Sequence, residues 1–252
     1  YIWKRKGEAT KGARTHSMKD VIISELKQKY GEEMTAKMFA YMGKILAANE
    51  HINLTAVREE DEFLEKHILD SLTCNDCDEF KAAEVVVDMG TGGGFPGIPL
   101  AITNPDKKFV LADSLNKRLK IIEQFAAELC IDNIELLHIR AEDMGQNPAY
   151  REKADICVSR AVASLDVLSE LCLPLVRKGG YFISYKGDGA EDEFDVAKRA
   201  ISILGGKLDR IEKPSLKNAY ISGHCLLLVK KVAHTPKRFP RKAGAAKKSP
   251  IR

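Results

Sequence analysis

The sequence lacks the features that would direct a protein into or across a membrane. It has no run of about 18 apolar residues and no signal-peptide pattern, so we expect neither a membrane-spanning helix nor secretion. Its six cysteines are scattered, mostly in apolar stretches, which is typical of reduced, buried thiols. Cys74 and Cys77 form one CxxC pair, but a structural zinc site needs a second pair, and none exists. We therefore expect a cytoplasmic protein without a metal site.

What the sequence does contain fits one α/β domain with an appendage. Its 252 residues, 44% hydrophobic and 30% charged, are typical of a globular protein. The net charge of +4 is unevenly distributed, because residues 230–252 carry +9, residues 1–19 carry +5 and residues 20–229 carry −10. An acidic body with basic ends predicts contact with a polyanion through the ends. The alternative is that the ends serve only solubility.

Hydrophobic periodicity separates a helical part from an alternating part. Apolar residues recur at helical spacing from Ser17, a candidate N-cap, to about residue 78. Strands and helices alternate from residue 84 onward, which predicts a seven-stranded, mostly parallel sheet with helices on both faces and an antiparallel final pair. The expected strands are 84–88, 109–113, 134–138, 154–158, 180–185, 207–211 and 223–230, and the expected helices are 97–103, 116–130, 163–176 and 190–204.

The expected domains follow from this division. Residues 1–17 precede Met18, a candidate natural start, and are expected to be a disordered or non-native basic extension. Residues 18–78 form a helical subdomain, residues 79–232 form the alternating domain, and residues 233–252 form a basic tail.

The most informative segment is a glycine-rich loop between a strand and a helix. The β-branched run before it ends in Asp88, and the helix after it begins near Gly97. This order is typical of a nucleotide-type site, because glycines let the backbone bend and let a ligand approach with no Cβ in the way. A second acid, Asp113, ends the next apolar run 25 residues later, near the spacing at which an acid binds ribose hydroxyls.

Two cofactors fit this loop. The glycines from 92 to 97 match a dinucleotide pattern, but the register closest to the strand places Phe95 where a glycine must allow close packing of helix on strand. The acid followed by spaced glycines, starting at Asp88, resembles S-adenosylmethionine sites. An acid there can lie near the cationic amino-acid end of that cofactor and would repel a pyrophosphate, so Asp88 favours the methyl donor. A merely structural glycine turn is the remaining alternative.

Several further segments occur together with this loop. They are Asn53-Leu54-Thr55-Ala56, His67-Ile68-Leu69-Asp70-Ser71-Leu72, Asp113-Ser114-Leu115-Asn116-Lys117-Arg118 and Ser159-Arg160-Ala161-Val162-Ala163-Ser164-Leu165. With the loop they resemble the small-subunit ribosomal RNA methyltransferase G family, also called glucose-inhibited division protein B, over about residues 18–242. The resemblance implies a Rossmann-like fold, and it implies that the protein uses S-adenosylmethionine as cofactor. It implies methylation of guanosine N7 in small-subunit (16S) ribosomal RNA, with that RNA or the small subunit as partner. We expect a monomer.

The resemblance also implies roles at the methionine end of the cofactor. Gly90, Gly92 and Gly94 would form the loop beneath this end. Backbone N–H groups around Phe95 would receive its carboxylate at the helix N-terminus, and Asp88 would lie near its amino group.

At the adenosine end, Asp113 would accept hydrogen bonds from both ribose hydroxyls, with Ser114 and Leu115 beside it. Ala141 and Glu142 would lie at the adenine, where a carboxylate can accept from the exocyclic amine. On residue type alone, Asp113 could be a helix N-cap and Glu142 a helix-start acid.

Arg160 follows the fourth strand, at the edge where open α/β sheets bind ligands, so we expect it to position substrate or cofactor. The other predicted RNA contacts are basic residues, namely Arg118, Lys186, Arg238, Arg241 and Lys242. His67 and Asp70 lie one helical turn apart and could form a local hydrogen-bonded pair. Asn53 is interpreted first as a turn or cap residue.

The chemistry that the resemblance implies needs no general base, because guanine N7 has an in-plane lone pair and no proton to lose. Proximity and alignment are then the main sources of catalysis. Three alternatives remain open: a small-molecule methyltransferase of the same fold, an NAD-dependent oxidoreductase, and a non-catalytic RNA-binding protein that kept the fold.

Overall fold

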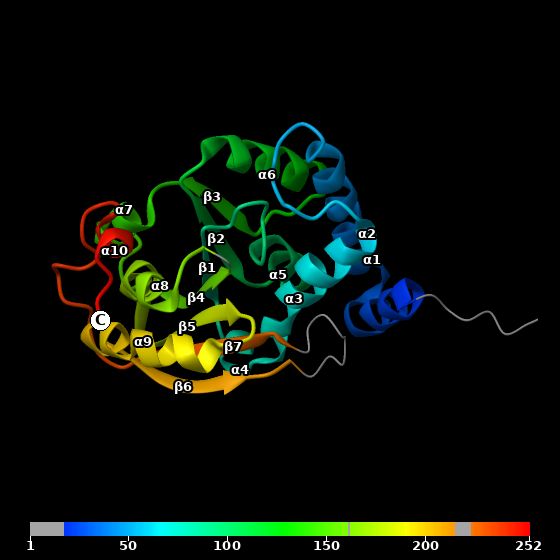
Figure 1. Ribbon diagram of the computed structural model, residues 1–252. Coiled ribbons are helices and arrows are strands. Elements are labelled where there is room, and N and C mark those ends of the chain that lie inside the picture. The colour runs from blue at the N-terminus through cyan, green and yellow to red at the C-terminus, as the bar shows by residue number, and fades with distance from the viewer. Residues whose placement is uncertain (1–17, 161, 215–222) are drawn as a thin grey trace, which may run out of the picture.

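A seven-stranded sheet forms the centre of the computed structural model, which describes residues 18–160, 162–214 and 223–252 (Figure 1). The strands are β1 Val85–Met89, β2 Lys108–Asp113, β3 Ile134–His138, β4 Ala154–Arg160, β5 Val176–Lys186, β6 Gly206–Glu212 and β7 Cys225–Lys231. Their order is β3-β2-β1-β4-β5-β7-β6, and β7 runs in the direction opposite to the other six strands. The predicted mostly parallel sheet is confirmed, and its reversed strand is inserted between β5 and β6.

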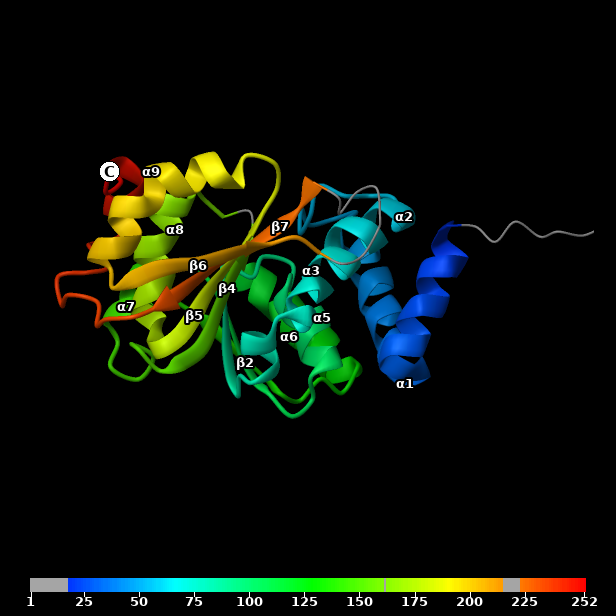
Figure 2. The ribbon, with the colours of Figure 1, turned by 90° about the horizontal axis from the view of Figure 1, so that it is seen from below.

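Both faces of the sheet are buried, because the central strands are nearly continuous apolar runs whose successive side chains point to opposite faces. On β1, for example, Val86 belongs to one hydrophobic cluster while Val87 and Met89 belong to the other. Helices α5 (Gly97–Thr103) and α6 (Asn116–Glu128) cover the first face together with the N-terminal helices. Helices α8 (Leu165–Cys172) and α9 (Ala190–Ile203) cover the second, as Figures 1 and 2 show.

Two helices differ from the sequence expectation. The segment predicted as one helix over 163–176 is α8 followed by a 3-10 turn, Leu173–Leu175, because Pro174 has no N–H with which to continue the α-helix. A short helix, α7 (Ala141–Gln146), is not among the expected helices, although its first turn holds Glu142, whose alternative interpretation was a helix-start acid. Its six residues include Gly145 and carry too few apolar positions for a period to be read.

The N-terminal helices pack on the first face of the sheet. Helix α1 (Met18–Ala48) bends at Gly31, which has a φ of +85°. It is followed by α2 (Glu60–Phe63), a π-helical turn (Leu64–Leu69), α3 (Asp70–Leu72), a 3-10 turn (Thr73–Asp76) and α4 (Asp78–Lys81). The predicted cap Ser17 and the extension 1–17 lie outside the described residues. The domain boundary at residue 78 stays a prediction, since these helices and the sheet share one hydrophobic cluster.

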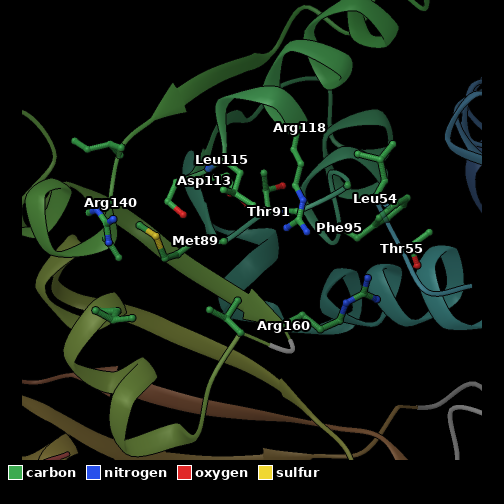
Figure 3. Close-up of a pocket in the computed structure, with 18 of the residues that line it drawn as sticks. Leu54, Thr55, Met89, Thr91, Phe95, Asp113, Leu115, Arg118, Arg140 and Arg160 are labelled. Atoms are coloured by element: carbon green, nitrogen blue, oxygen red, sulfur yellow. Dashed lines mark hydrogen bonds between the residues drawn. The ribbon is translucent and has the colours of Figure 1, made fainter. Parts of the chain in front are cut away.

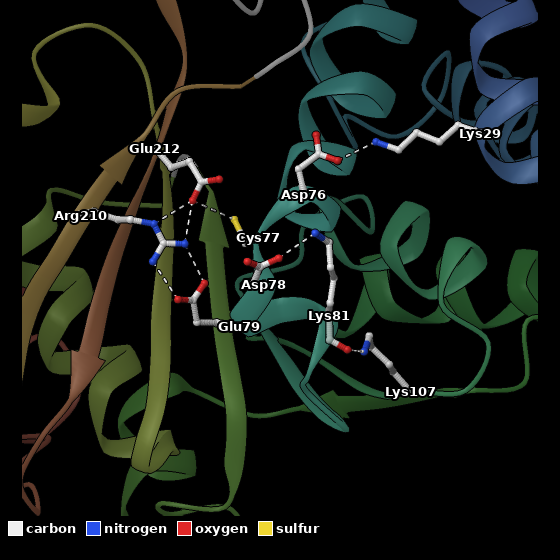
Figure 4. A network of polar contacts seen from close by, with 9 residues as sticks. All are labelled: Lys29, Asp76, Cys77, Asp78, Glu79, Lys81, Lys107, Arg210 and Glu212. Carbon is white, nitrogen blue, oxygen red and sulfur yellow. Dashed lines mark hydrogen bonds and ion pairs between the residues drawn. The ribbon is translucent and has the colours of Figure 1, made fainter.

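Ion pairs fasten α4 to the edge strand β6 (Figure 4). The Arg210 guanidinium donates to both carboxylate oxygens of Glu79, at 2.8 and 2.7 Å, and to Glu212 at 3.0 and 2.8 Å. The Cys77 thiol lies 3.7 Å from the Glu212 carboxylate. All six cysteines are free and five are buried, Cys130 being exposed, as expected of reduced thiols. None of the helices in the described ranges is both long and apolar enough to span a membrane.

The basic C-terminal segment, residues 233–252, folds back onto α7 and α8. Phe239 is buried in the second hydrophobic cluster, and Arg151 donates to the carbonyls of Thr235 and Phe239 at 2.8 and 2.7 Å. Arg241 pairs with Glu170 of α8, whose side chain is 1% exposed, through bonds of 2.6 to 3.1 Å. The segment predicted as a basic tail thus packs against the sheet domain and includes the short helix α10 (Ala245–Lys248).

We expect Arg241→Ala to lower the free energy of unfolding by about 3 kcal/mol, because it leaves the Glu170 carboxylate buried without its counter-charge. Urea unfolding followed by circular dichroism measures this loss. Lys247→Ala, on the exposed side of the same segment, is the matched control and should change stability by less than about 0.5 kcal/mol. Equal stabilities of the two variants would contradict the role given to the ion pair.

Candidate active site

A cavity of about 530 Å³ opens at the carboxyl ends of β1, β2 and β4 (Figure 3). Open α/β sheets bind ligands at this edge, and the volume lies within the range of small-molecule sites. The glycine loop, the ends of β1 and β2, the start of α7 and the segment before α2 all contribute lining residues. Among them are Thr55, Met89, Gly92, Asp113, Glu142 and Arg160.

The loop glycines serve two different purposes. Gly90 and Gly92 line the cavity and have φ values of +77° and +58°, which glycine adopts without strain. Gly94 also has a positive φ but faces away, toward α1. A Cβ at Gly94 would lie 2.5 Å from the Tyr41 hydroxyl, which itself donates to the Gly93 carbonyl at 2.9 Å. Gly94 therefore lets α1 support the loop from behind.

Asp88 lies beneath the loop and is fully buried. Its Oδ2 accepts hydrogen bonds from the Thr91 hydroxyl at 2.7 Å and from the Gly97 N–H at 2.9 Å, while its Oδ1 has no partner among the described residues. Burial raises the pKa of Asp88 to about 6. The structure thus gives Asp88 the role of joining the loop to the start of α5, and its direct contact with a cofactor stays a prediction.

Asp113 faces the cavity from the end of β2. Its carboxylate accepts from the Gly92 N–H at 2.9 Å and the Leu115 N–H at 2.8 Å, which fixes its orientation. Two bonds leave acceptor capacity on both oxygens for a ligand. Ser114 and Leu115 line the cavity beside it, and Leu115 is 50% exposed, so its apolar side chain faces the open space.

The predicted adenine residues Ala141 and Glu142 line the same cavity from the first turn of α7. Phe95 lines it as well, as does Arg118. The Glu142 carboxylate accepts a hydrogen bond of 2.8 Å from the Gly244 N–H, so the C-terminal segment contacts this side of the site. All predicted cofactor residues except the buried Asp88 and the backward-facing Gly94 therefore line one cavity.

Arg160, at the end of β4, points toward the N-terminal helices (Figure 3). One guanidinium nitrogen donates at 2.8 Å to the Lys66 carbonyl and to the Asp70 carboxylate, and the other donates at 2.9 Å to His67 Nδ1. The Asp70 carboxylate also contacts His224, at 2.9 Å. The local His67–Asp70 pair that the spacing suggested is thus replaced by two separate contacts with Arg160.

His67 is held neutral between an arginine and a threonine. Burial, and then the Arg160 charge, lowers the pKa of His67 to about 3. A guanidinium can only donate, so Nδ1 accepts, and the remaining proton sits on Nε2, which lies 2.6 Å from the Thr55 hydroxyl. The imidazole also stacks on Phe95, with ring centroids 4.8 Å apart and planes at 19°.

The remaining predicted residues are spread over the molecule. Lys186 pairs with Glu193 at 2.6 Å beside a second cavity, and Arg238 and Lys242 are exposed on the C-terminal segment. The Arg241 guanidinium, predicted to contact RNA, forms an ion pair with Glu170. Asn53 is exposed and accepts from Arg58 at 3.0 Å, as a turn residue can.

Sequence reasoning missed the contribution of the segment before α2. Leu54 and Thr55 line the cavity, although they lie more than 30 residues before the glycine loop. The available signal was the segment Asn53-Leu54-Thr55-Ala56, which contributes to the family resemblance, but in it only Asn53 was given an interpretation, as a turn or cap residue. Neither periodicity nor composition shows that a turn packs against a distant loop.

Comparisons with known proteins agree on one family. The protein-family model described as "rRNA small subunit methyltransferase G" matches residues 34–221. A protein named ribosomal RNA small subunit methyltransferase G from Clostridium novyi is 46% identical, over 81% of this chain and 83% of its own length. The protein of the same name from Lactobacillus helveticus is 48% identical, over 84% of this chain and 88% of its own length. The solved mitomycin 7-O-methyltransferase MmcR shares the fold, with a TM-score of 0.52 at 11% identity over 66% of this chain and 54% of that chain.

We expect Gly94→Ala to destabilise the protein by about 2–4 kcal/mol, because the added Cβ combines an unfavourable φ with a clash against Tyr41. Gly92→Ala should cost only about 1 kcal/mol, since no atom lies closer than 4.0 Å to the position of its Cβ. Chemical unfolding of both variants measures the difference. Equal losses would show that α1 does not support the loop through Gly94.

We expect His67 to remain neutral down to about pH 4, where an unperturbed histidine would be charged. Because its folded pKa lies below its unfolded value, the unfolded state binds the proton first, and stability is lost as the pH falls from about 6.5 toward 3. A titration of ¹³C,¹⁵N-labelled histidine by NMR gives the pKa and the tautomer together. An inflection near pH 6.5 would mean that the Arg160 contact does not persist in solution.

Proposed function

The chain belongs to the rRNA small subunit methyltransferase G family, and from this premise we propose that it methylates N7 of a guanosine in 16S ribosomal RNA with S-adenosylmethionine as donor. The observation that carries the proposal is the cavity in which the glycine loop and the Asp113 carboxylate meet. We further propose that the enzyme acts as a monomer in the cytoplasm, on the RNA or on the small ribosomal subunit.

The residues present fit the cofactor. The backbone at Gly92 leaves room where a side chain would stand, since no atom lies closer than 4.0 Å to the position of its Cβ, which suits the methionine end; Gly90 lines the cavity beside it. Asp113 offers oriented carboxylate oxygens to a pair of ribose hydroxyls, and the exposed Leu115 offers an apolar surface to a flat base. Glu142 can accept from the adenine amine while keeping its bond to Gly244.

When bound, S-adenosylmethionine supplies an electrophilic methyl group on its sulfonium. The task of the chain is then to bind, orient and exclude water, because guanine N7 carries no proton that must be removed. The site agrees with this requirement, since His67, which lines the cavity, is engaged through both ring nitrogens and held neutral. Catalysis would come mainly from alignment of the reacting groups.

Basic side chains around the cavity would hold the RNA against an otherwise acidic body. Arg118 lines the cavity, and Arg238 and Lys242 are exposed on the C-terminal segment. Arg160 and Lys186 already have partners and would act on the base rather than on phosphates. Affinity for RNA should therefore fall with increasing salt.

The test is transfer of an isotope-labelled methyl group to small ribosomal subunits that lack the modification, followed by digestion and mass spectrometry of the nucleosides. We expect labelled 7-methylguanosine. Label in a different nucleoside, or binding of S-adenosylhomocysteine without any label in RNA, would overturn the assigned acceptor. A protein that does not bind S-adenosylhomocysteine would contradict the assignment of S-adenosylmethionine as the methyl donor.

Asp113→Asn is the diagnostic variant for the cofactor site. It replaces one carboxylate oxygen by an NH₂ group that must face an N–H, so affinity for S-adenosylhomocysteine should fall about tenfold or more. Asp143→Asn, an exposed neighbour on α7, is the matched control and should bind normally. Isothermal titration calorimetry measures both.

A further inference from the structure

A second cavity of about 500 Å³ adjoins the first. His67, Arg160 and Val162 line both cavities, so the two spaces meet along these three side chains. Val162 lies close above the glycine loop, since a Cβ at Gly90 would be 2.7 Å from it, and it is 44% exposed. A ligand in the second cavity would thus lie next to the methionine end of the first.

Two charged side chains that line the second cavity, Arg160 and Glu193, differ in how close they lie to the first cavity. Arg160 stands at the border with the first cavity, whereas Lys186 and Glu193 line the second cavity alone. Lys186 donates to Glu193 Oε2 at 2.6 Å, and the same oxygen accepts from the Leu165 N–H at 3.1 Å. Moving away from the first cavity, a ligand would therefore meet Arg160 before it meets Glu193.

Glu193 has one carboxylate oxygen, Oε1, that can accept hydrogen bonds from a ligand. Both oxygens of Asp70, the other acid that lines this cavity, are bound, one to Arg160 and one to His224. Glu193 Oε1 has no hydrogen bond from the described residues, and its side chain is 40% exposed. An oriented acceptor without a donor, on the wall of a cavity, is suited to a ligand N–H.

This order of charges matches one base edge. Starting from N7, guanine presents two acceptors, N7 and O6, and then two donors, N1–H and the N2 amine. Adenine presents a donor, its N6 amine, where guanine has O6, and an acceptor at N1. If N7 faces the first cavity, the Arg160 guanidinium at the border suits O6, and the Glu193 carboxylate farther out suits N1–H and N2–H. Adenine would place its amine against Arg160 and its N1 against the Glu193 carboxylate.

We propose that the second cavity binds the target guanine and that Glu193 determines specificity by accepting from its N1–H and N2 amine. The inference rests on the proposed function, because it takes a guanosine N7 as the acceptor. It assigns Lys186 to the orientation of Glu193.

Glu193→Gln is the variant that tests this. The amide oxygen can still accept from Leu165, while the NH₂ group puts a donor where guanine also donates. We expect kcat/KM for methyl transfer to 16S rRNA to fall about 10- to 100-fold, with affinity for S-adenosylhomocysteine and the urea midpoint nearly unchanged. Glu191→Gln, an exposed acid on the same helix outside both cavities, is the control and should stay within about twofold of the wild type.

A substrate analogue gives a reading that does not depend on how much variant is folded. Inosine lacks the N2 amine, so ligated rRNA with inosine at the target position should be methylated about tenfold more slowly by the wild type. Glu193→Gln should treat guanosine and inosine alike. A Glu193→Gln enzyme with wild-type activity, or with the wild-type preference for guanosine, would overturn the assignment.

Failure of the proposed function gives a different result. The wild type would then place no label on guanine N7 even while it binds S-adenosylhomocysteine. In that case the assignment of the second cavity to the target guanine would also be wrong.

Discussion

The contact of Arg160 with the N-terminal helices is the interaction on which the geometry of the site depends. Its guanidinium links the end of β4 to the Lys66 carbonyl, to Asp70 and to His67. Asp70 is 3% exposed, and a carboxylate at that depth requires a paired charge. The same contact sets the tautomer of His67 and, through stacking, the position of Phe95. Two parts of the chain that are distant in sequence are thereby held at one sheet edge.

The two acids at adjacent strand ends show how environment divides roles between like residues. Asp88 and Asp113 both lie at the carboxyl end of a strand, and both accept backbone N–H bonds from the loop region. Asp88 is covered completely, and burial raises its pKa to about 6. Asp113 lines the cavity and keeps acceptor capacity directed toward a ligand. A spacing of acids in sequence cannot distinguish these cases, because burial is decided by distant segments.

Local patterns were sufficient for the sheet and for most of one cavity. β-Branched runs located the strands to within a few residues, and the glycine loop with Asp113 located the cavity at the edge of the sheet. The failures have a common cause, which is that contacts between distant segments leave no local signal. The backward-facing Gly94, the lining residues Leu54 and Thr55, and the pairing of Arg241 with Glu170 all depend on such contacts. Charge alone, for the same reason, does not show that the Arg241 guanidinium is paired with Glu170.

The packing of the C-terminal segment has a consequence for the order in which the protein matures. Synthesis proceeds from the N-terminus, so β1 to β5 and the glycine loop leave the ribosome before Arg241 and Gly244 do. Until then, Glu170 has no guanidinium to balance its charge, and Glu142 lacks the N–H that orients it. The nascent domain can form its sheet early, but the side of its pocket that Glu142 lines is completed only when this late segment docks. A translation product cut short after β7 would therefore carry a formed sheet with an unfinished pocket.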